Sequence, residues 1–431
     1  MHRIWNKYRT AVIAALFFPL ISLAQTTGTY SGFSPYSVYG TGLPHDGGTA
    51  WNRGMGGIGI AARNRRFINI ENPAAVSARD TLSFMADFGL SSRLGAFSLD
   101  GKANVGNTFN VDDFVISFPM WNHSGMMIGL TPVSDVGYNV SATGMDMNTG
   151  GTNTSSSFGN GGLYQLFAGA GATFWNRLSL GLQGGFVFGS VGKLCTTTYQ
   201  SSSVRSTVKG DSLQVNAFNL KAGLQYEQPL STNSSLIFGA TAQFSLPMGG
   251  HVISFWQAGN EKNRSERELS GEGLRLPDKL GAGISYRRAD NFSIELDYSL
   301  TDGTRTGFDT AAGFSNVGMD GDFAGSIGHS IRAGAEWTPN RNDIRYFLRR
   351  CTYRAGVYYV QTPFTVNGSS IDDLGFSIGM TLPVFRYYNG FTLGVSAGRR
   401  GWAPGQIKEY YAAFSIGMNI FDIWFQKPRY E

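Results

Sequence analysis

The sequence is poor in charge and has no long apolar run. Only 15% of its 431 residues are Asp, Glu, Lys or Arg, fewer than a soluble multi-domain chain of this length usually carries. Beyond residue 25 there is no stretch of 18 or more apolar residues, which excludes membrane-spanning helices. The net charge is only +5, and no run of Lys and Arg with interleaved aromatic residues occurs, so the sequence predicts no nucleic-acid partner.

Glycine and aromatic residues are abundant instead. The chain has 58 glycines and 13% aromatic residues, yet its mean hydropathy is -0.13. Strands with one lipid-facing and one polar side would give this composition.

The first 24 residues have the three parts of a secretory signal peptide. Residues 3–9 contain three basic side chains, residues 11–21 (AVIAALFFPLI) are apolar, and residues 22–24 (SLA) end in a small residue. We expect cleavage before Gln25. A membrane anchor is the alternative, but this apolar run is too short to span a bilayer. No cysteine follows the run, so the segment is not a lipoprotein signal.

Apolar and polar residues alternate along most of the chain. Between residues 292 and 300, Phe, Ile, Leu, Tyr and Leu alternate with Ser, Glu, Asp and Ser. A soluble β-sandwich also alternates, but its solvent face usually carries more Lys and Glu. Here the polar partners are mainly Gly, Ser, Thr, Asn and Gln, which favours the crowded interior of a closed barrel.

The connections between the predicted strands alternate between short and long along the chain. Those after even-numbered strands are mostly short, whereas those after odd-numbered strands are mostly long and rich in Gly, Ser, Thr and charge. A barrel with both ends of its chain in the periplasm has short turns on that side and long loops outside. A sandwich with crossover connections has no reason to keep this parity.

We therefore predict an all-β fold, a 14-stranded antiparallel transmembrane β-barrel in the bacterial outer membrane. Cys195 and Cys351 then lie at opposite ends of the barrel, so we expect free thiols. The strands are expected at residues 81–91, 109–119, 124–142, 160–174, 177–191, 213–228, 234–247, 278–287, 291–301, 328–338, 351–362, 372–384, 390–400 and 409–420.

The stretch at residues 53–75 (RGMGGIGIAARNRRFINIENPAA) precedes the first strand and begins with four glycines in six residues. A dinucleotide-binding loop would need a preceding strand, a following helix and an acidic residue about 20 positions further on. Residues 40–48 (GTGLPHDGG) cannot form a buried strand, and Asn72-Pro73 interrupts any helix. The stretch therefore does not predict a nucleotide site.

The same stretch resembles a motif of the long-chain fatty-acid transporter (FadL) family, the OmpP1/FadL/TodX family. There the pattern R-G-(M/A)-G-G-(A/I)-G-(V/I)-A, followed after a gap by N-P-A, leads into the first strand. Residues 53–61 (RGMGGIGIA) and 72–75 (NPAA) match both halves. The resemblance implies fourteen strands and an N-terminal plug. Residues 419–425 and the basic tail after them resemble the C-terminal segment of family members, among which are secretion-system barrels.

After the signal peptide (1–24), we expect an N-terminal plug or hatch segment (25–79), as the resemblance implies, then a transmembrane barrel (80–420) and a periplasmic tail (421–431). Glycine lets a backbone pass close to the inner wall, and Pro73 stiffens the entry into the first strand. Arg63, Arg65 and Arg66 would be costly in lipid but tolerable in a polar lumen. The plug residues expected from the motif are Arg53, Gly54, Gly56, Gly57, Gly59, Asn72 and Pro73.

Five charged residues on three adjacent predicted strands share the inward face: Glu295, Asp297, Arg332, Glu336 and Arg354. One interpretation is a cross-strand ion network that fills the lumen and makes a wide, water-filled pore improbable. The other is a polar rim that holds the head group of a ligand. The sequence favours the network.

No set of residues predicts a catalytic or metal site, so we expect a protein that is not an enzyme and has no cofactor. The five histidines lack metal-ligand spacing, and no nucleophile elbow is present. Asp112-Asp113 is interpreted as a strand-end charge rather than an acid–base pair. Residues 320–322 (DGD), with Asp302 and Asp309, could bind Ca²⁺ but lack the rest of a calcium loop.

If the resemblance holds, the protein passively transports hydrophobic small molecules, such as fatty acids, across the outer membrane. Ligand would bind an apolar pocket and leave when the plug shifts or a lateral gap opens. Ile253, Phe255 and Trp256 are the candidate pocket residues, with simple loop packing as an equal alternative. The rival function is a non-transporting barrel, a subunit or docking platform of an outer-membrane secretion or protein-assembly complex. The amphoteric residues 261–277, where a short helix is possible, and the basic tail 427–431 fit such a role.

Overall fold

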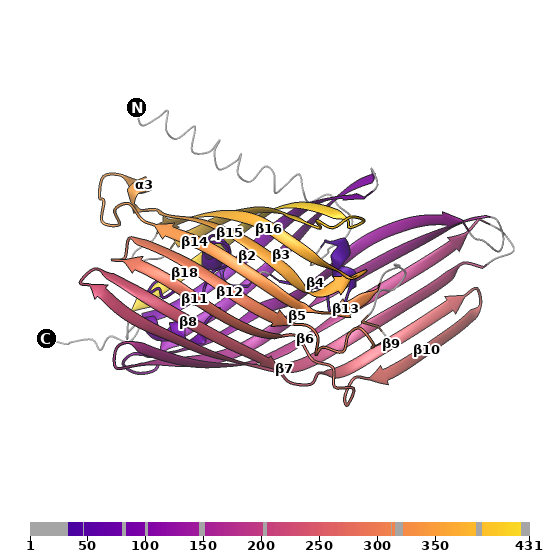
Figure 1. The fold of residues 1–431 in the computed structure, drawn as a ribbon, viewed down its shortest axis with the longest axis horizontal. Helices are drawn as coiled ribbons and strands as arrows, with labels where there is room; N and C mark the ends of the chain where they lie inside the picture. The colour runs from indigo at the N-terminus through magenta and orange to yellow at the C-terminus, as the bar shows by residue number, and fades with distance from the viewer. Residues whose placement is uncertain are drawn as a thin grey trace, which may run out of the picture.

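The computed structural model describes residues 33–45, 47–79, 83–99, 102–145, 151–200, 205–311, 313–314, 322–384 and 390–423. Within these residues, fourteen long antiparallel strands close into a barrel (Figure 1). Closure is made by the last strand, which pairs with the first from Ile423 opposite Ser83 to Lys408 opposite Ser98. The predicted fold class is therefore confirmed. The predicted signal peptide (1–24) and residues 424–431 of the predicted tail lie outside the described residues.

The wall strands follow chain order, and each pairs with its neighbours along the sequence. They are β2 (Ser83–Leu99), β3 (Lys102–Pro119), β4 (Ser124–Met145), β5 (Thr152–Phe174), β6 (Leu178–Tyr199), β7 (Thr207–Ser231), β8 (Ser234–Ser245), β11 (Asp278–Arg288), β12 (Phe292–Asp302), β14 (Ile327–Trp337), β15 (Thr352–Val366), β16 (Ser369–Pro383), β17 (Gly390–Arg400) and β18 (Lys408–Ile423).

The remaining elements are short or lie outside the wall. A hairpin of β9 (Gly249–Ala258) and β10 (Glu261–Glu268) is inserted between β8 and β11, and β13 (Phe323–Gly325) pairs with β15. The chain before the wall contains η1 (Pro35–Val38), β1 (Leu43–Pro44), α2 (Ala50–Arg53) and η2 (Pro73–Ala78), and α3 (Phe347–Arg350) lies between β14 and β15. None of the helices among the described residues is long and apolar enough to cross a membrane.

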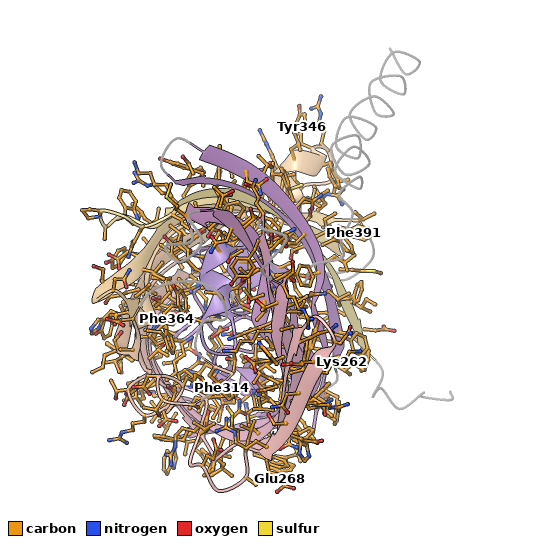
Figure 2. The ribbon with its side chains drawn as sticks, turned by 90° about the vertical axis from the view of Figure 1, so that its right-hand side faces the viewer. Lys262, Glu268, Phe314, Tyr346, Phe364 and Phe391 are labelled. Carbon is orange, nitrogen blue, oxygen red and sulfur yellow. The ribbon has the colours of Figure 1, made fainter. Side chains whose placement is uncertain are left out.

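The strands have one apolar and one polar face, as the alternation predicts. On β12, Ile294, Leu296 and Tyr298 are exposed on the outer surface, whereas Glu295 and Asp297 face inward and are buried. Outward apolar side chains would contact lipid, and the inward polar side chains must find partners inside the barrel. Figure 2, which views the barrel along its length, shows Phe314 and Phe364 inside the ring of strands.

The two ends of the barrel differ. At the turn end, defined by the β3–β4, β5–β6, β7–β8 and β11–β12 connections and lying on the left of Figure 1, the turns are tight. His123, Trp175, Asn176 and Ala289 take positive φ values of 59°, 49°, 57° and 47° there. The opposite end, with β9 and β10, is the loop end. The predicted turn at 387–389 is not among the described residues.

Several strands continue further than predicted at the loop end. Residues 143–157 and 192–212 were expected to be loops because they are rich in Gly, Ser and Thr, but most of them lie in β4–β7 and pair in register, for example Ser155 with Thr197. Residues 261–268 form β10 rather than part of a short helix. At the turn end, β18 runs past the predicted barrel boundary at residue 420, because Ile423 pairs with Ser83 of β2.

Candidate functional site, the plug inside the barrel

The plug segment, residues 33–45 and 47–79, lies within the ring of strands (Figures 1 and 2). Short capped turns shape it. Ser34 caps η1, the Thr49 N–H donates to Asn52 Oδ1 (3.0 Å) at the start of α2, and Asn72 Oδ1 accepts from the Ala74 N–H (3.0 Å) at the start of η2. Polar caps satisfy the orphan N–H groups of each turn, so the segment needs few regular backbone pairs with the wall.

The glycine-rich motif contacts the wall through backbone. Gly56 and Gly57 adopt φ values of +74° and +76°, which side-chain-bearing residues rarely adopt. The wall contributes glycines where the motif passes: any Cβ on Gly334 or Gly356 would overlap the backbone of Met55. Sequence analysis identified the plug glycines but not these wall glycines, whose signal is only a Gly at an inward position of a strand.

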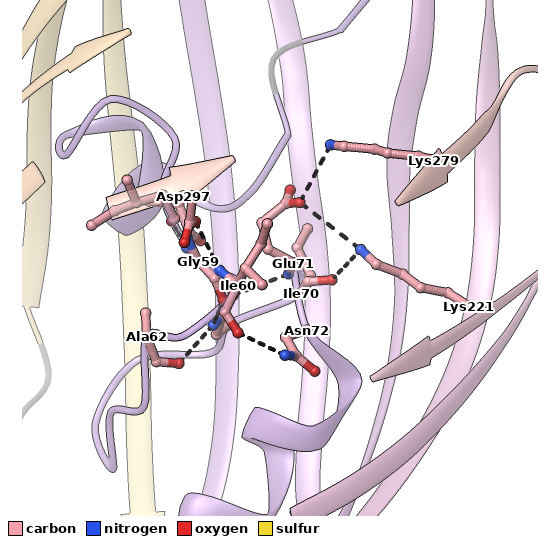
Figure 3. A network of polar contacts seen from close by, with 12 residues as sticks. Gly59, Ile60, Ala62, Ile70, Glu71, Asn72, Lys221, Lys279 and Asp297 are labelled. Carbon is pink, nitrogen blue, oxygen red and sulfur yellow. Dashed lines mark hydrogen bonds and ion pairs between the residues drawn. The ribbon is translucent and has the colours of Figure 1, made fainter. Parts of the chain in front are cut away.

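Carboxylates of β12 bind the plug backbone directly. Asp297 Oδ2 accepts from the N–H groups of Gly59 (2.8 Å) and Ile60 (2.9 Å), and Glu295 Oε1 accepts from the Ala61 N–H (3.0 Å). Figure 3 shows Asp297 against Gly59 and Ile60. Three successive plug amides are thus held by two inward residues of one wall strand.

The other predicted lumen residues also face the plug. Glu336 Oε2 accepts from the indole N–H of Trp51 (2.7 Å) and from Arg354 Nε (2.8 Å). Arg332 donates to the carbonyl of Gly56 (3.1 Å). All five predicted residues therefore face the lumen, and Glu336 and Arg354 form a cross-strand ion pair among them. Most partners of these five residues are groups of the plug, which alternation could not indicate because it gives the face of a residue and not its partner.

A seam separates β3 from β4 over much of their length. These strands pair only over Phe114–Pro119. Beyond that point the plug takes the place of β3: Leu43 and Pro44 of β1 pair with β4, and the Ser34 N–H donates to the carbonyl of Gly137 (2.7 Å). The plug thus supplies part of the strand pairing of the wall itself.

Buried charges join the plug to both sides of this seam. His45 Nδ1 lies 2.6 Å from Asp135 of β4, and its Nε2 lies 3.4 Å from Asp112 of β3. Arg53 contacts Asp112 (3.0 Å) and Asp113 (3.2 Å). The prediction that Asp112 and Asp113 are strand-end charges is therefore wrong, because both are buried within β3. A bulge in the β2–β3 register turns both inward.

The electrostatics of the plug follow from burial and these partners. Burial alone would lower the pKa of the His45 imidazole, but Asp135 and Asp112 outweigh it and raise the pKa from 6.5 to about 10. Burial lowers the pKa of the Arg63 guanidinium to about 10, although Glu227 opposes this. His45 is therefore a cation at neutral pH and a charged link across the seam.

The second half of the plug is held near the turn end. Arg63 donates to Ser179 (2.6 Å) and Thr173 (3.0 Å), and Arg66 contacts Asp290 (3.0 Å). Arg66 therefore pairs with an exposed carboxylate of the β11–β12 turn, whereas Arg63 lies 3.4 Å from Glu227 of β7.

A cavity of about 300 Å³ remains between the plug and the upper wall. Glu71 faces it and lies 3.9 Å from Lys221 and 4.0 Å from Lys279 (Figure 3). Burial would raise the pKa of the Glu71 carboxyl, but the two lysines outweigh it and lower the pKa. The rest of the lining mixes polar and apolar side chains. The polar ones include Gln165, Gln183, Asn219, Gln243, Ser299 and His329, and the apolar ones include Ile70, Phe167, Phe308, Phe323 and Phe364.

The candidate pocket residues lie elsewhere. Ile253, Phe255 and Trp256 are on β9, which pairs with β7 and β10 beyond the end of β8. None of the three lines the 300 Å³ cavity, and Phe255 and Trp256 are exposed. The hairpin carries them away from the lumen.

No described group of three or more His, Cys, Asp or Glu residues is placed to hold a metal. Residues 320 and 321 of the possible calcium loop are not among those described. Cys195 and Cys351 are buried and unpaired, as predicted.

Comparisons with known proteins match this chain to one family by sequence and to another group of proteins by fold. A sequence model of the BamG family matches residues 7–431. A comparison with curated proteins gave no match. Among solved structures, the chain is similar to the CymD monoaromatic hydrocarbon channel (TM-score 0.56, 15% identity, 86% of this chain and 97% of that one) and to the Ralstonia pickettii toluene transporter TbuX (0.56, 14%, 87% and 98%).

A Pseudomonas aeruginosa FadL homologue is also similar (TM-score 0.53, 10% identity, 89% of this chain and 100% of that one). The fold that the motif at residues 53–75 predicted is therefore confirmed as that of FadL-type barrels. Identities this low establish the fold alone, and the family whose sequence model matches is a different one.

Proposed function

The chain belongs to the BamG family, and from this premise we propose that it is a closed outer-membrane barrel, which serves as a subunit or docking platform of a larger outer-membrane complex. The similarity of its fold to outer-membrane channels supports a location in the outer membrane. The parity of its connections supports an orientation with the turn end in the periplasm. Transport is not part of this proposal.

One observation carries the proposal: the plug is hydrogen-bonded to the wall strands and completes part of their pairing, rather than packing loosely in the lumen. It pairs with β4 at the seam, donates three amides to β12 carboxylates, and contacts β14 through Glu336 and Arg332. A gate that must move would break these buried contacts together, and each broken one leaves an unsatisfied polar group.

Passive transport of hydrophobic small molecules is the second candidate. It is favoured by the likeness to hydrocarbon channels and by the cavity beside the plug. Sites for such ligands are mainly lined by apolar side chains. Apolar lining residues such as Phe167, Phe308 and Phe364 suit such a ligand, whereas Glu71 with Lys221 and Lys279 does not. The attachment of the plug to the wall, rather than the lining, therefore weighs against this function.

A paired experiment separates the two. The purified protein would be reconstituted in liposomes and planar bilayers, and membranes of the native host would be solubilised in mild detergent with a tagged copy. We expect no conductance, no uptake of toluene or a fatty acid, and near-stoichiometric recovery of large outer-membrane partners by mass spectrometry. Uptake that falls when the cavity-lining Phe308 and Phe364 are changed to Glu, with no recovered partner, would establish transport instead.

A further inference from the structure

The connection between β14 and β15, residues 338–351, exposes an unusual set of apolar side chains. Ile344 is 100% exposed and Leu348 64%, and Tyr346 and Phe347 are also exposed. Three consecutive large apolar side chains, at 346–348, and a fourth two residues before them are rarely left in water unless they bind something. The connection lies at the turn end, where α3 projects from the barrel (Figure 1), and Tyr346 points away from the strands (Figure 2).

This connection is a folded element. Asp343 Oδ1 accepts from the N–H groups of Arg345 (2.9 Å) and Tyr346 (2.8 Å), and Oδ2 lies 3.4 Å from Arg349. The Tyr353 hydroxyl donates to the carbonyl of Leu348 (3.0 Å). The apolar side chains are thus held outward rather than left free to fold back.

The element is continuous with the lipid-facing surface. Tyr353 and Trp337 lie side by side at the turn-end margin of β15 and β14, with ring centroids 6.2 Å apart. Such aromatic pairs mark the level of lipid head groups in outer-membrane barrels. Because Tyr353 is also the residue that holds Leu348, the exposed side chains begin at the edge of the bilayer.

The charge of the element matches an anionic layer. Residues 338–351 contain four arginines and one aspartate. The guanidinium groups of Arg345 and Arg349 lie over the Tyr346 ring, 5.3 and 4.9 Å from its centroid, and Arg350 lies 5.2 Å from that of Phe347. Arginine beside aromatic and aliphatic side chains is the composition of interfacial membrane-binding segments.

We propose that the β14–β15 connection is a membrane-binding element that inserts Ile344, Tyr346, Phe347 and Leu348 among the phospholipid head groups at the turn end, with arginines contacting lipid phosphate. It fixes the tilt and rotation of the barrel in the bilayer from one side. No role of the lumen or of a partner protein is needed for this contact.

Spin-label depth measurements test the proposal in the full-length mature protein. In a Cys195→Ala, Cys351→Ala background, a single nitroxide is attached at Ile344→Cys, and the protein is placed in nanodiscs of phosphatidylethanolamine with or without phosphatidylglycerol. Thr232→Cys, in the β7–β8 turn at the same end, is the matched control. We expect the label at 344 to be several-fold more accessible to oxygen than to a water-soluble nickel chelate, and the label at 232 to show the reverse.

The charge contribution is tested separately. Phosphatidylglycerol should deepen the label at 344, and Arg345→Gln with Arg349→Gln should abolish that dependence on lipid charge. Retention of the heat-dependent gel mobility of a folded barrel verifies each variant. The proposal is overturned if the label at 344 is as accessible to the nickel chelate as the label at 232 in every lipid mixture. A label that becomes protected only when a partner protein is added would overturn it too, and would identify a protein-docking site.

Discussion

Asp297→Ala should release the centre of the plug while leaving the barrel intact. The substitution removes the acceptor of two buried amides, those of Gly59 and Ile60. A hydrogen bond to a charged group contributes about 1.5–3 kcal/mol, and a buried N–H left without a partner costs about 1–3 kcal/mol. Some rearrangement will recover part of this loss, so we expect local opening of the plug to become easier by about 3–6 kcal/mol.

Hydrogen–deuterium exchange measures this opening directly. Because each 1.4 kcal/mol changes an equilibrium tenfold, peptides that cover residues 55–62 should exchange about 100- to 10,000-fold faster in the variant. Peptides from β5, β6 and β7 should exchange at the wild-type rate, since their pairing does not involve Asp297. Exchange is followed by mass spectrometry in nanodiscs near neutral pH.

Two further variants make the result specific. Asp297→Asn keeps one acceptor oxygen and should show a smaller increase. Ser299→Ala, two residues along the same face of β12, should show none. If exchange at residues 55–62 changes less than threefold in Asp297→Ala while the barrel stays folded, the carboxylate does not hold the plug and the reasoning fails.

Three other predictions concern the seam, the wall glycines and the thiols. Because the folded pKa of His45 is about 10 and its ordinary value is 6.5, its stabilising contribution is complete below about pH 6.5 and is lost as pH rises through 10. The difference in Tm between wild type and His45→Gln should therefore shrink to zero above pH 10, and a constant difference would contradict the charged link. Gly356→Ala places a Cβ on the backbone of Met55 and should lower stability by about 1–3 kcal/mol, measured by thermal unfolding. Gly192→Ala, where the nearest atom is 3.8 Å away, should change little. Cys195 and Cys351 should react with maleimide only after unfolding, and a non-reducing gel shift of the folded protein would contradict this.

Alternation was sufficient to predict the wall because lipid on one side and a polar lumen on the other impose a period of two on every strand. It failed at the loop end for a physical reason. Ser155 and Thr197 pair at the loop end, where the strands are rich in small polar residues and the apolar alternation is lost, so composition alone indicated a loop. The β9–β10 hairpin was missed in the same way, since all of β10 is exposed and polar.

The plug could be located from its motif, but its partners could not. Inward orientation placed Glu295 and Asp297 in the lumen, yet nothing in the sequence shows that they accept from backbone amides rather than pair with Arg332. The bulge that turns Asp112 and Asp113 toward Arg53 depends on a single extra residue in the register of β3. Such a slip changes the face of a residue without changing the local pattern of residue types.

The plug contacts also set a lower limit on the free energy that a ligand would have to supply to open the barrel. Moving the first half of the plug breaks the contacts of Asp297, of Glu295, of Trp51 with Glu336, and of Arg53 with the β3 carboxylates. At about 1.5–3 kcal/mol each, four such contacts amount to roughly 6–12 kcal/mol. The open state would then hold at most about one molecule in ten thousand. A ligand can shift that equilibrium only by its differential affinity for the open state, so it would need four or more orders of magnitude of preference.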